Sequence, residues 1–305
     1  MQRANSFHDP SHLYFSRKTE FSLARTGACM KITLKRSRDK QDLIARENGA
    51  QKQLLTNNWS AVVLLAVLIA GWELYVRIDR ISVLILPPPS AVAAALVENW
   101  DVIAVHTWQT LLETVLGMGV AIVLGVALAI LLDLSFIARR AVYPLLVISQ
   151  TIPIIALAPL LLIWFGFDIG PKVIVVTLYC FFPITVACVD GVSAAQPELL
   201  NLLKSMKASR WQILRLVRLP GAMPSFFSGL RIAATYSVTG AIFGEFVGAY
   251  QGLGIFMENS ANSHALDLVF AAIVVTALLS LALFALVSLA ERLTIPWYHG
   301  SRRHL

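Results

Sequence analysis

Five polar residues that can bind a small molecule lie within stretches of sequence that are otherwise strongly apolar. An amide and a carboxylate can exchange hydrogen bonds with ring nitrogens and amino groups, and a tyrosine can stack on a flat ring. No cluster of His, Asp or Glu in these stretches has the spacing of a metal site or of an acid–base pair. We therefore expect binding chemistry and no catalytic residue, metal or cofactor. The five residues are Gln150, Thr151, Tyr236, Thr239 and Glu245.

The composition predicts a membrane protein. Of the 305 residues, 57% are hydrophobic and 14% are charged, and the mean hydropathy is +0.70, whereas soluble domains carry about 25% charged residues. A spanning helix needs about 20 apolar residues. The apolar runs are continuous, which favours helices over a transmembrane barrel with its alternating strands of about ten residues. The six predicted spans are 59–75, 107–132, 141–165, 172–192, 226–247 and 268–290.

Polar groups inside such spans are costly and usually face a protein interior or an aqueous cavity. The five residues are therefore predicted to line a pathway through the membrane. Glu245 lies near the end of the fifth span, where it would contact a cargo, pair within a gate or reach water. Arg231, in the same span, would either extend to lipid head groups or take part in pairing. Pro153 loosens the third span because it lacks an N–H.

The distribution of cations predicts the orientation, because Lys and Arg resist translocation. Eleven of the 25 lie in residues 1–52, two follow the second span, five lie between the fourth and fifth spans, and three lie near the end. Both termini are therefore predicted to be cytoplasmic. Only Arg77, Arg80 and Lys172 fall on the opposite side. Because orientation accounts for the net charge of +7, we expect no nucleic-acid partner.

Residues 1–52 form a polar, basic segment without a helical period. This composition predicts a disordered cytoplasmic tail, with a partner-binding arm as the alternative. Met30 is a second candidate for the start of translation. Residues 59–297 are predicted to form the membrane domain.

A basic amphipathic segment, residues 196–218, separates the fourth and fifth spans. Leu199, Leu200, Leu203 and Met206 fall on one face at helical spacing. One interpretation is a helix that lies on the membrane surface with its cations toward lipid head groups. The other is an apolar face that fits a groove on a partner protein.

The sequence PELLNLLKSMKASRWQILRLVRLPGAMPSFFSGLR resembles the cytoplasmic EAA loop in permeases of binding-protein-dependent ABC importers, where a short helix docks on an ATPase subunit. The resemblance covers residues 59–297. It implies an all-α type I importer permease fold with six transmembrane helices in the bacterial inner membrane. It also implies a homodimer that works with two ATPase copies and a substrate-binding protein. The residues that would couple to the ATPase are Leu199, Leu203, Met206, Lys207, Ala208, Ser209, Arg210 and Trp211.

Two departures from the family pattern occur in this segment. The usual Glu-Ala-Ala is replaced by Asn201, Leu202 and Leu203, and a usual glycine is replaced by Lys207. Glycine permits a turn with positive φ, whereas a side chain there costs about 1 kcal/mol. Either the bend differs in this chain or some coupling efficiency is lost. The chain contains no G-x-x-x-x-G-K-[ST] motif, so we expect the ATPase to be a separate polypeptide.

The segments SQTIPIIALAPLLLIWFG and GAIFGEFVGAYQGLG resemble those of nitrate, sulfonate and taurine permeases, and most closely those of permeases for hydroxymethylpyrimidine precursors of thiamine. The resemblance implies import of a small solute of the pyrimidine class. A sulfonate, taurine or nitrate importer is the alternative. A stand-alone channel or secondary transporter is an alternative of a different class, against which the docking segment argues.

Overall fold

The computed structural model describes residues 58–195 and 197–296, and every regular element in this part of the chain is a helix. The chain divides into two compact units, residues 1–71 and 72–305. The predicted tail, residues 1–52, lies outside the described residues. α2 (Asn58–Ile78) contains the boundary between the units. The helices of the second unit are α3 (Pro89–Glu98), α4 (Trp100–Leu134), α5 (Phe136–Ser149), α6 (Ile154–Phe165), α7 (Ile169–Ser193), α8 (Pro197–Ser205), α9 (Arg210–Ile213), a π-helix (Leu214–Arg218), α10 (Leu219–Phe246), α11 (Leu253–Asn262) and α12 (Leu266–Thr294).

Helices occupy all six predicted spans, which confirms the all-helical membrane fold. Among the described residues, α2, α4, α7 and α12 are long and apolar enough to cross a membrane, and the bent pair α5–α6 would be a fifth span. α10 coincides with the fifth predicted span and has 28 residues. It is not among the apolar candidates because Arg231 and many small or polar residues interrupt its hydrophobic sequence.

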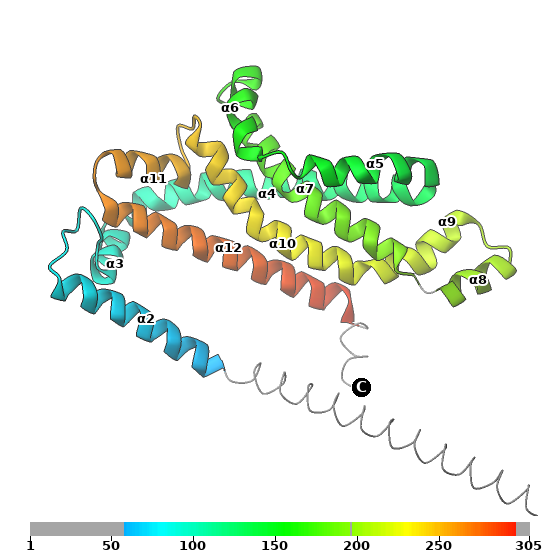
Figure 1. Cartoon of the computed structure of the whole chain (residues 1–305), viewed down its shortest axis with the longest axis horizontal. Coiled ribbons are helices and arrows are strands. Elements are labelled where there is room, and N and C mark those ends of the chain that lie inside the picture. Colours follow the sequence, from blue (N-terminus) through cyan, green and yellow to red (C-terminus); the bar gives the residue numbers. More distant parts are fainter. Residues whose placement is uncertain (1–57, 196, 297–305) are drawn as a thin grey trace, which may run out of the picture. The chain divides into compact units, whose positions relative to one another are not determined.

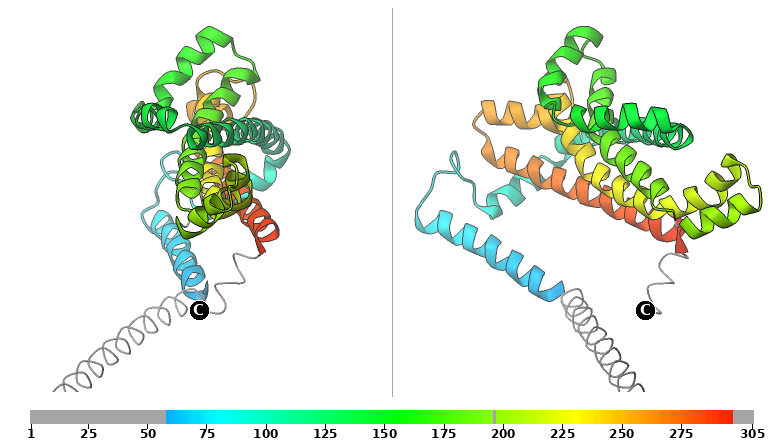
Figure 2. Two further views of the ribbon diagram at one scale, coloured as in Figure 1. Left: turned by 90° about the vertical axis from the view of Figure 1, so that its right-hand side faces the viewer. Right: turned by 45° about the vertical axis from the view of Figure 1, so that its right-hand side comes forward.

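The third predicted span, 141–165, is occupied by helices but is not one continuous helix. The structure has two helices, α5 and α6, that meet at 96°, and Figure 2 shows α6 turning sharply away from α5. The break includes Thr151 and Pro153. Proline cannot donate the helical hydrogen bond, and it disfavours a helical conformation in the residue before it. Pro153 therefore ends α5 and begins α6 rather than merely loosening one helix.

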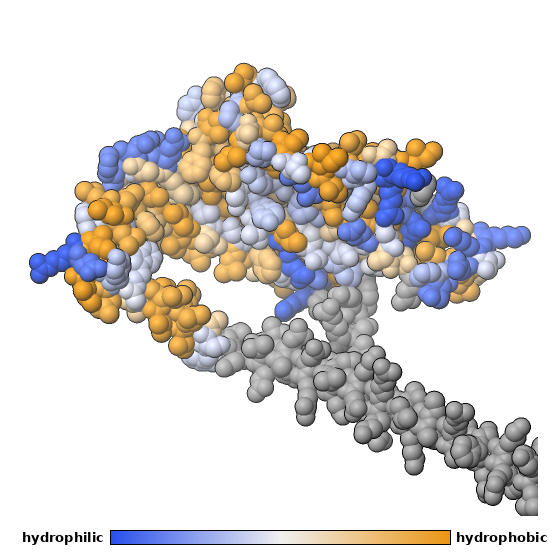
Figure 3. Space-filling model, viewed as in Figure 1, coloured by the Kyte–Doolittle hydropathy of each residue, from blue (hydrophilic) through white to orange (hydrophobic). Residues whose placement is uncertain are grey.

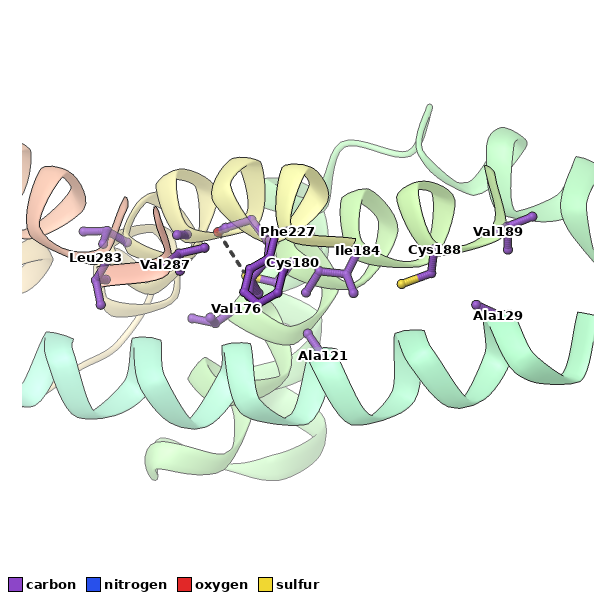
Figure 4. Close-up of a cluster of buried hydrophobic side chains, with 14 of the residues drawn as sticks. Ala121, Ala129, Val176, Cys180, Ile184, Cys188, Val189, Phe227, Leu283 and Val287 are labelled. Atoms are coloured by element: carbon purple, nitrogen blue, oxygen red, sulfur yellow. Dashed lines mark hydrogen bonds between the residues drawn. The ribbon is translucent and has the colours of Figure 1, made fainter. Parts of the chain in front are cut away.

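α7 packs against both α4 and α10, and these three helices form most of the core. Figure 4 shows Val176, Cys180 and Ile184 of α7 between Ala121 of α4 and Phe227 of α10. The Cys180 thiol donates a hydrogen bond to the Ala233 carbonyl at 3.4 Å. The core is thus a continuous contact along the length of α7.

Glycines permit this close contact. A Cβ at Gly117 of α4 would lie 2.5 Å from the Val176 side chain, and one at Gly229 of α10 would lie 2.7 Å from the Pro183 carbonyl oxygen. Lipid supplies no hydrophobic drive for helices to associate, so membrane helices rely on packing of this kind. The small residues therefore set the spacing of α4, α7 and α10.

α8 and α9 lie at one end of these helices, and α3 and α11 lie at the other (Figure 1). Figure 3 shows strongly hydrophilic residues mainly toward the two ends, including the end with α5, α8 and α9, and a mixture of hydrophobic and near-neutral residues over much of the face between them. This distribution fits helices that cross a hydrocarbon layer with their ends in water.

The turn after α8 keeps the backbone geometry of a glycine although it contains Lys207. Lys207 has φ of 58°. Its N–H donates to the Lys204 carbonyl at 2.9 Å, and the Ala208 N–H donates to the Leu203 carbonyl at 3.0 Å. These two bonds define a Schellman motif, in which the left-handed residue is usually glycine. Of the two alternatives from the sequence, a changed bend is therefore excluded.

A single continuous helical path follows this turn. Ser209 and Gln212 form a capping box, in which the Gln212 N–H donates to the Ser209 hydroxyl and the Ser209 N–H donates to the Gln212 side chain. α9, the π-helix and α10 then continue without a break from Arg210 to Phe246. At 1.5 Å per residue this path is roughly 55 Å long, and it joins the two ends of the fold.

We expect Lys207→Gly to slow hydrogen exchange at the amides of residues 207 and 208 by about fivefold, because it removes about 1 kcal/mol of left-handed strain. The matched variant Lys204→Gly lies in the last helical turn of α8 and should accelerate exchange there. Mass spectrometry of the full-length protein in detergent measures both effects. Faster exchange in both variants would contradict the left-handed turn.

Candidate functional site

Three ionisable side chains meet inside the end of the helices that carries α11. Glu113 comes from α4, Lys172 from α7 and Glu245 from α10. Lys172 Nζ lies 3.5 Å from Glu113 Oε1, and their side chains are 5% and 0% exposed. Glu245 is also fully buried and interacts electrostatically with both. We call these three residues the Glu–Lys–Glu cluster.

The packing of α7 against its neighbours brings the cluster together. Gly244 lies next to Glu245, and a Cβ there would be 3.3 Å from Lys172 Cα. Gly117, one turn from Glu113, allows the equally close contact of α4 with α7. The lysine of α7 therefore lies against Glu113, and Glu245, far apart from both in the sequence, lies close enough to interact electrostatically with them.

Glu245 holds the first turn of α11. Its Oε2 accepts a hydrogen bond from the Gly254 N–H at 2.6 Å, and its Oε1 accepts one from the Thr110 hydroxyl at 2.7 Å. The Thr110 oxygen accepts the Leu253 N–H at 2.8 Å. Helix N-termini carry unpaired N–H groups and partial positive charge, which a carboxylate satisfies. Glu245 and Thr110 thus cap α11 from two other helices.

The backbone before α11 admits little but glycine. Gly252 has φ of 134°, its N–H donates to His106 Nδ1 at 3.0 Å, and a Cβ there would collide with the carboxyl group of Glu245. A Cβ at Gly254 would lie 2.6 Å from the Ile242 carbonyl oxygen. The composition of residues 248–254, rich in glycine, suits either a re-entrant turn or an exposed loop. Gly252 and Gly254 are buried, so this part of the stretch packs against its neighbours, whereas Tyr250 is exposed.

The cluster contains two carboxylates and one lysine. Gln109 donates to Glu113 Oε1 at 2.8 Å, while Glu113 Oε2 has no hydrogen-bond partner among the described residues. Buried charges inside a membrane are costly and mark candidate functional positions. The described residues contain no group of three or more His, Cys, Asp or Glu that could hold a metal ion. The cluster can orient α11, since it supplies fixed charge and acceptors to the start of that helix.

The structure separates the five predicted pathway residues into three places. Tyr236 and Thr239 lie on one exposed face of α10, and Tyr236 is 49% exposed. Gln150 and Thr151 are exposed at the break between α5 and α6. Glu245 has no exposed surface, so in this conformation it neither reaches water nor contacts a solute. A pathway role for the four exposed residues stays a prediction.

Sequence reasoning missed most partners of Glu245. Glu113 lies inside the second predicted span, where the cost of an ionisable residue could have identified it. Lys172 was interpreted only as an orientation signal. Nothing in the sequence indicated that Thr110 and His106 would bind backbone N–H groups at the start of a helix more than 140 residues away. For Arg231, the structure shows the pairing alternative, because its NH1 lies 2.6 Å from Glu291 Oε2 of α12.

The predicted coupling segment presents an apolar surface with no cover from the described residues. α8 has no buried residue, and Leu199, Leu202 and Met206 are exposed, the last two at 58% and 71%. We call these three residues the α8 face. Leu203, predicted to lie on this face, is half-buried, and Leu202 takes its place. Leu199 and Met206 belong both to the apolar face expected from the sequence and to the α8 face.

The other predicted coupling residues surround the turn between α8 and α9. Trp211 is 57% exposed. Arg210 begins α9 and Ser209 caps it. Lys207 is exposed and Ala208 is half-buried. Their contact with an ATPase stays a prediction.

We expect Lys172→Met to destabilise the protein by about 3 kcal/mol, because it leaves two buried carboxylates without a cation. The double variant Lys172→Met with Glu113→Gln should recover most of this loss. Unfolding in mixed detergent micelles measures the order of stability of these variants and the unmodified protein. Lys204→Met, at an exposed lysine, is the control. Equal stability of the single variant and the unmodified protein would show that the cluster carries no net charge interaction.

Comparison with known proteins identifies the family. Residues 121–295 match the family described as "Binding-protein-dependent transport system inner membrane component". A probable ABC transporter permease protein from Haemophilus influenzae is 37% identical over 73% of this chain and 91% of its own length. The formylaminopyrimidine transport permease protein ThiX from Halalkalibacterium halodurans is 37% identical over 76% of this chain and 92% of its own length.

More distant proteins agree on the fold. The taurine transport permease protein TauC from Escherichia coli is 32% identical over 77% of this chain and 88% of its own length. A structure of the MetNI methionine ABC transporter in an inward-facing conformation has a TM-score of 0.58 at 20% identity, and covers 64% of this chain and 97% of that chain. The type I importer permease fold expected from the resemblance is confirmed.

These matches assign a membrane transport component rather than an enzyme, and they imply an ATPase and a substrate-binding protein as partners. The chain belongs to the family of inner membrane components of binding-protein-dependent transport systems, as a multi-pass permease of an ABC importer.

Proposed function

We propose that this permease imports an aminopyrimidine precursor of thiamine, such as hydroxymethylpyrimidine. The observation that carries the proposal is the 37% identity to a formylaminopyrimidine permease over 76% of the chain. Residues 121–295, which match the permease family, include the exposed face of α10, where a solute would pass between two copies of the chain. Thiamine precursors of this class are flat, neutral or weakly basic rings.

The chemistry of the α10 face favours such a ring. Tyr236 and Thr239 are exposed together with Ile232 and Thr235, and none of the four is charged. A tyrosine can stack on a pyrimidine, and threonine hydroxyls can exchange hydrogen bonds with its nitrogens. The nearby cation, Arg231, is paired with Glu291. A sulfonate would instead favour cations or helix N-termini.

The similarity to a taurine permease makes a sulfonate the second candidate cargo. The two candidates differ in charge, so direct competition for uptake separates them.

We further propose that the α8 face docks on the ATPase in the cytoplasm, with both chain termini on that side. An exposed row of Leu199, Leu202 and Met206 on a helix without buried residues fits an apolar groove. Two ATPase copies would bind a homodimer of this chain. Movement of α8 would pass into α10 along the continuous helical path from Arg210.

Leu202→Asp and Met206→Asp should each reduce co-purification of the ATPase more than about tenfold, because a charge would enter an apolar groove. Asn201→Asp adds the same charge at the adjacent exposed polar position and should bind the ATPase nearly normally. Pull-down from detergent extracts, normalised to the amount of inserted permease, measures the difference. Undiminished capture by both Leu202→Asp and Met206→Asp would instead place α8 on the lipid surface.

Tyr236→Leu should lower hydroxymethylpyrimidine uptake about fivefold, while Tyr236→Phe should keep most of it, because the ring supplies the stacking. Proteoliposomes with the ATPase and the loaded binding protein measure radiolabelled uptake. Robust uptake of an organosulfonate by the unmodified protein, unaffected by the pyrimidine, would reject the cargo assignment. The assignment as a permease would remain.

A further inference from the structure

An ion pair, separate from the Glu–Lys–Glu cluster, joins the last turn of α4 to the start of α10. Arg218, the last residue of the π-helix, pairs through NH1 with Oδ1 of Asp133. The Asp133 side chain is 10% exposed and that of Arg218 is 28% exposed. Within the described residues, the buried Nε of Arg218 has no hydrogen-bond partner. The guanidinium is therefore partly buried and paired with one acidic group.

Stability alone does not explain such a pair. Burying two charges costs free energy that their attraction roughly offsets, and well-packed apolar residues of similar volume usually serve as well. The guanidinium is planar and directional, so the pair fixes the relative position of two helices more narrowly than an apolar contact does. The pair therefore fixes the position of α4 relative to the start of α10.

Apolar packing beside the pair is incomplete. An apolar pocket of about 210 Å³, partly open to the surface, lies among α4, α7 and α10, and its lining includes Ala129, Cys188 and Met223. Leu214 of the π-helix packs with Val192 and Ala222 at the same end. Because the helices around a pocket make fewer contacts with one another, packing alone constrains their separation less there. The ion pair adds a directional contact to this region.

The pair joins α4 to the coupling segment. α8 and α9 continue into α10 through the backbone, so a displacement of the segment reaches α10 directly. α4 has no such continuity, but Asp133 attaches its end to Arg218. The other half of α4 carries Thr110 and Glu113, which hold α11 and Lys172.

We propose that Asp133 and Arg218 are positioning residues of the transport cycle, whose ion pair makes α4 follow the displacement of the coupling segment. This inference rests on the proposed function, since it takes α8 as the contact with the ATPase. It assigns the pair to the transmission of movement and not to ATPase binding, because neither residue belongs to the α8 face.

The test compares two double variants in proteoliposomes with the ATPase and the loaded binding protein. Asp133→Leu with Arg218→Leu removes both charges and leaves no buried charge unpaired. It should capture the ATPase normally, yet the solute imported per ATP hydrolysed should fall about tenfold, within the range of allosteric coupling. Asp133→Arg with Arg218→Asp restores an ion pair and should recover the ratio to within about threefold.

The matched control is Asp190→Leu with Arg292→Leu, which removes one exposed acid and one exposed cation without touching the pair. Its transport ratio should stay unchanged. An unchanged ratio in the leucine double variant, or no recovery in the swapped variant, would overturn the proposal. If the leucine variant fails to insert, Arg218→Lys takes its place, since it keeps the charge but loses the planar geometry, and an unchanged ratio there also overturns the proposal. Failure of the unmodified permease to capture the ATPase would instead reject the proposed function.

Discussion

α7 approaches both α4 and α10 so closely that several positions along the contact accept no side chain. Gly117 faces Val176, Gly229 faces Pro183 and Gly240 faces Tyr179. In a membrane the apolar surface of a helix gains little by leaving lipid, so close packing and buried polar contacts must hold the helices together. The short distances set by these glycines determine which polar groups can meet, and the rest of the structure depends on them.

At the end with α11, this spacing brings Lys172 against Glu113 and brings Glu245 to the first turn of α11. Burying the carboxylate of Glu245 costs free energy, and this carboxylate accepts a hydrogen bond from a free N–H group at the start of α11. α11 is therefore held by α4 and α10 together. Any relative movement of these two helices would alter the contacts at its first turn.

At the opposite end, the coupling segment shows that backbone geometry can persist when its usual residue is replaced. Lys207 occupies the left-handed position of the turn, held by two backbone hydrogen bonds and followed by the Ser209 capping box. The departure from the family pattern therefore costs strain without changing the bend. The turn still presents the α8 face away from the helices, as contact with a second protein requires.

The sequence by itself determined the membrane class, the position of the helices and the amphipathic insert, because each depends on local composition and period. Residues such as Pro153 also marked a break, although local chemistry did not predict the 96° bend between α5 and α6. The period of the sequence likewise placed Leu199 and Met206 on one face of α8, whereas the greater exposure of Leu202 than of Leu203 depends on the neighbouring elements. Only the tertiary structure decided that Glu245 caps α11, that Lys172 pairs with Glu113, and that Asp133 meets Arg218. These contacts join residues between 9 and 85 positions apart, and their existence depends on the distance between helices, which no local pattern of residues encodes.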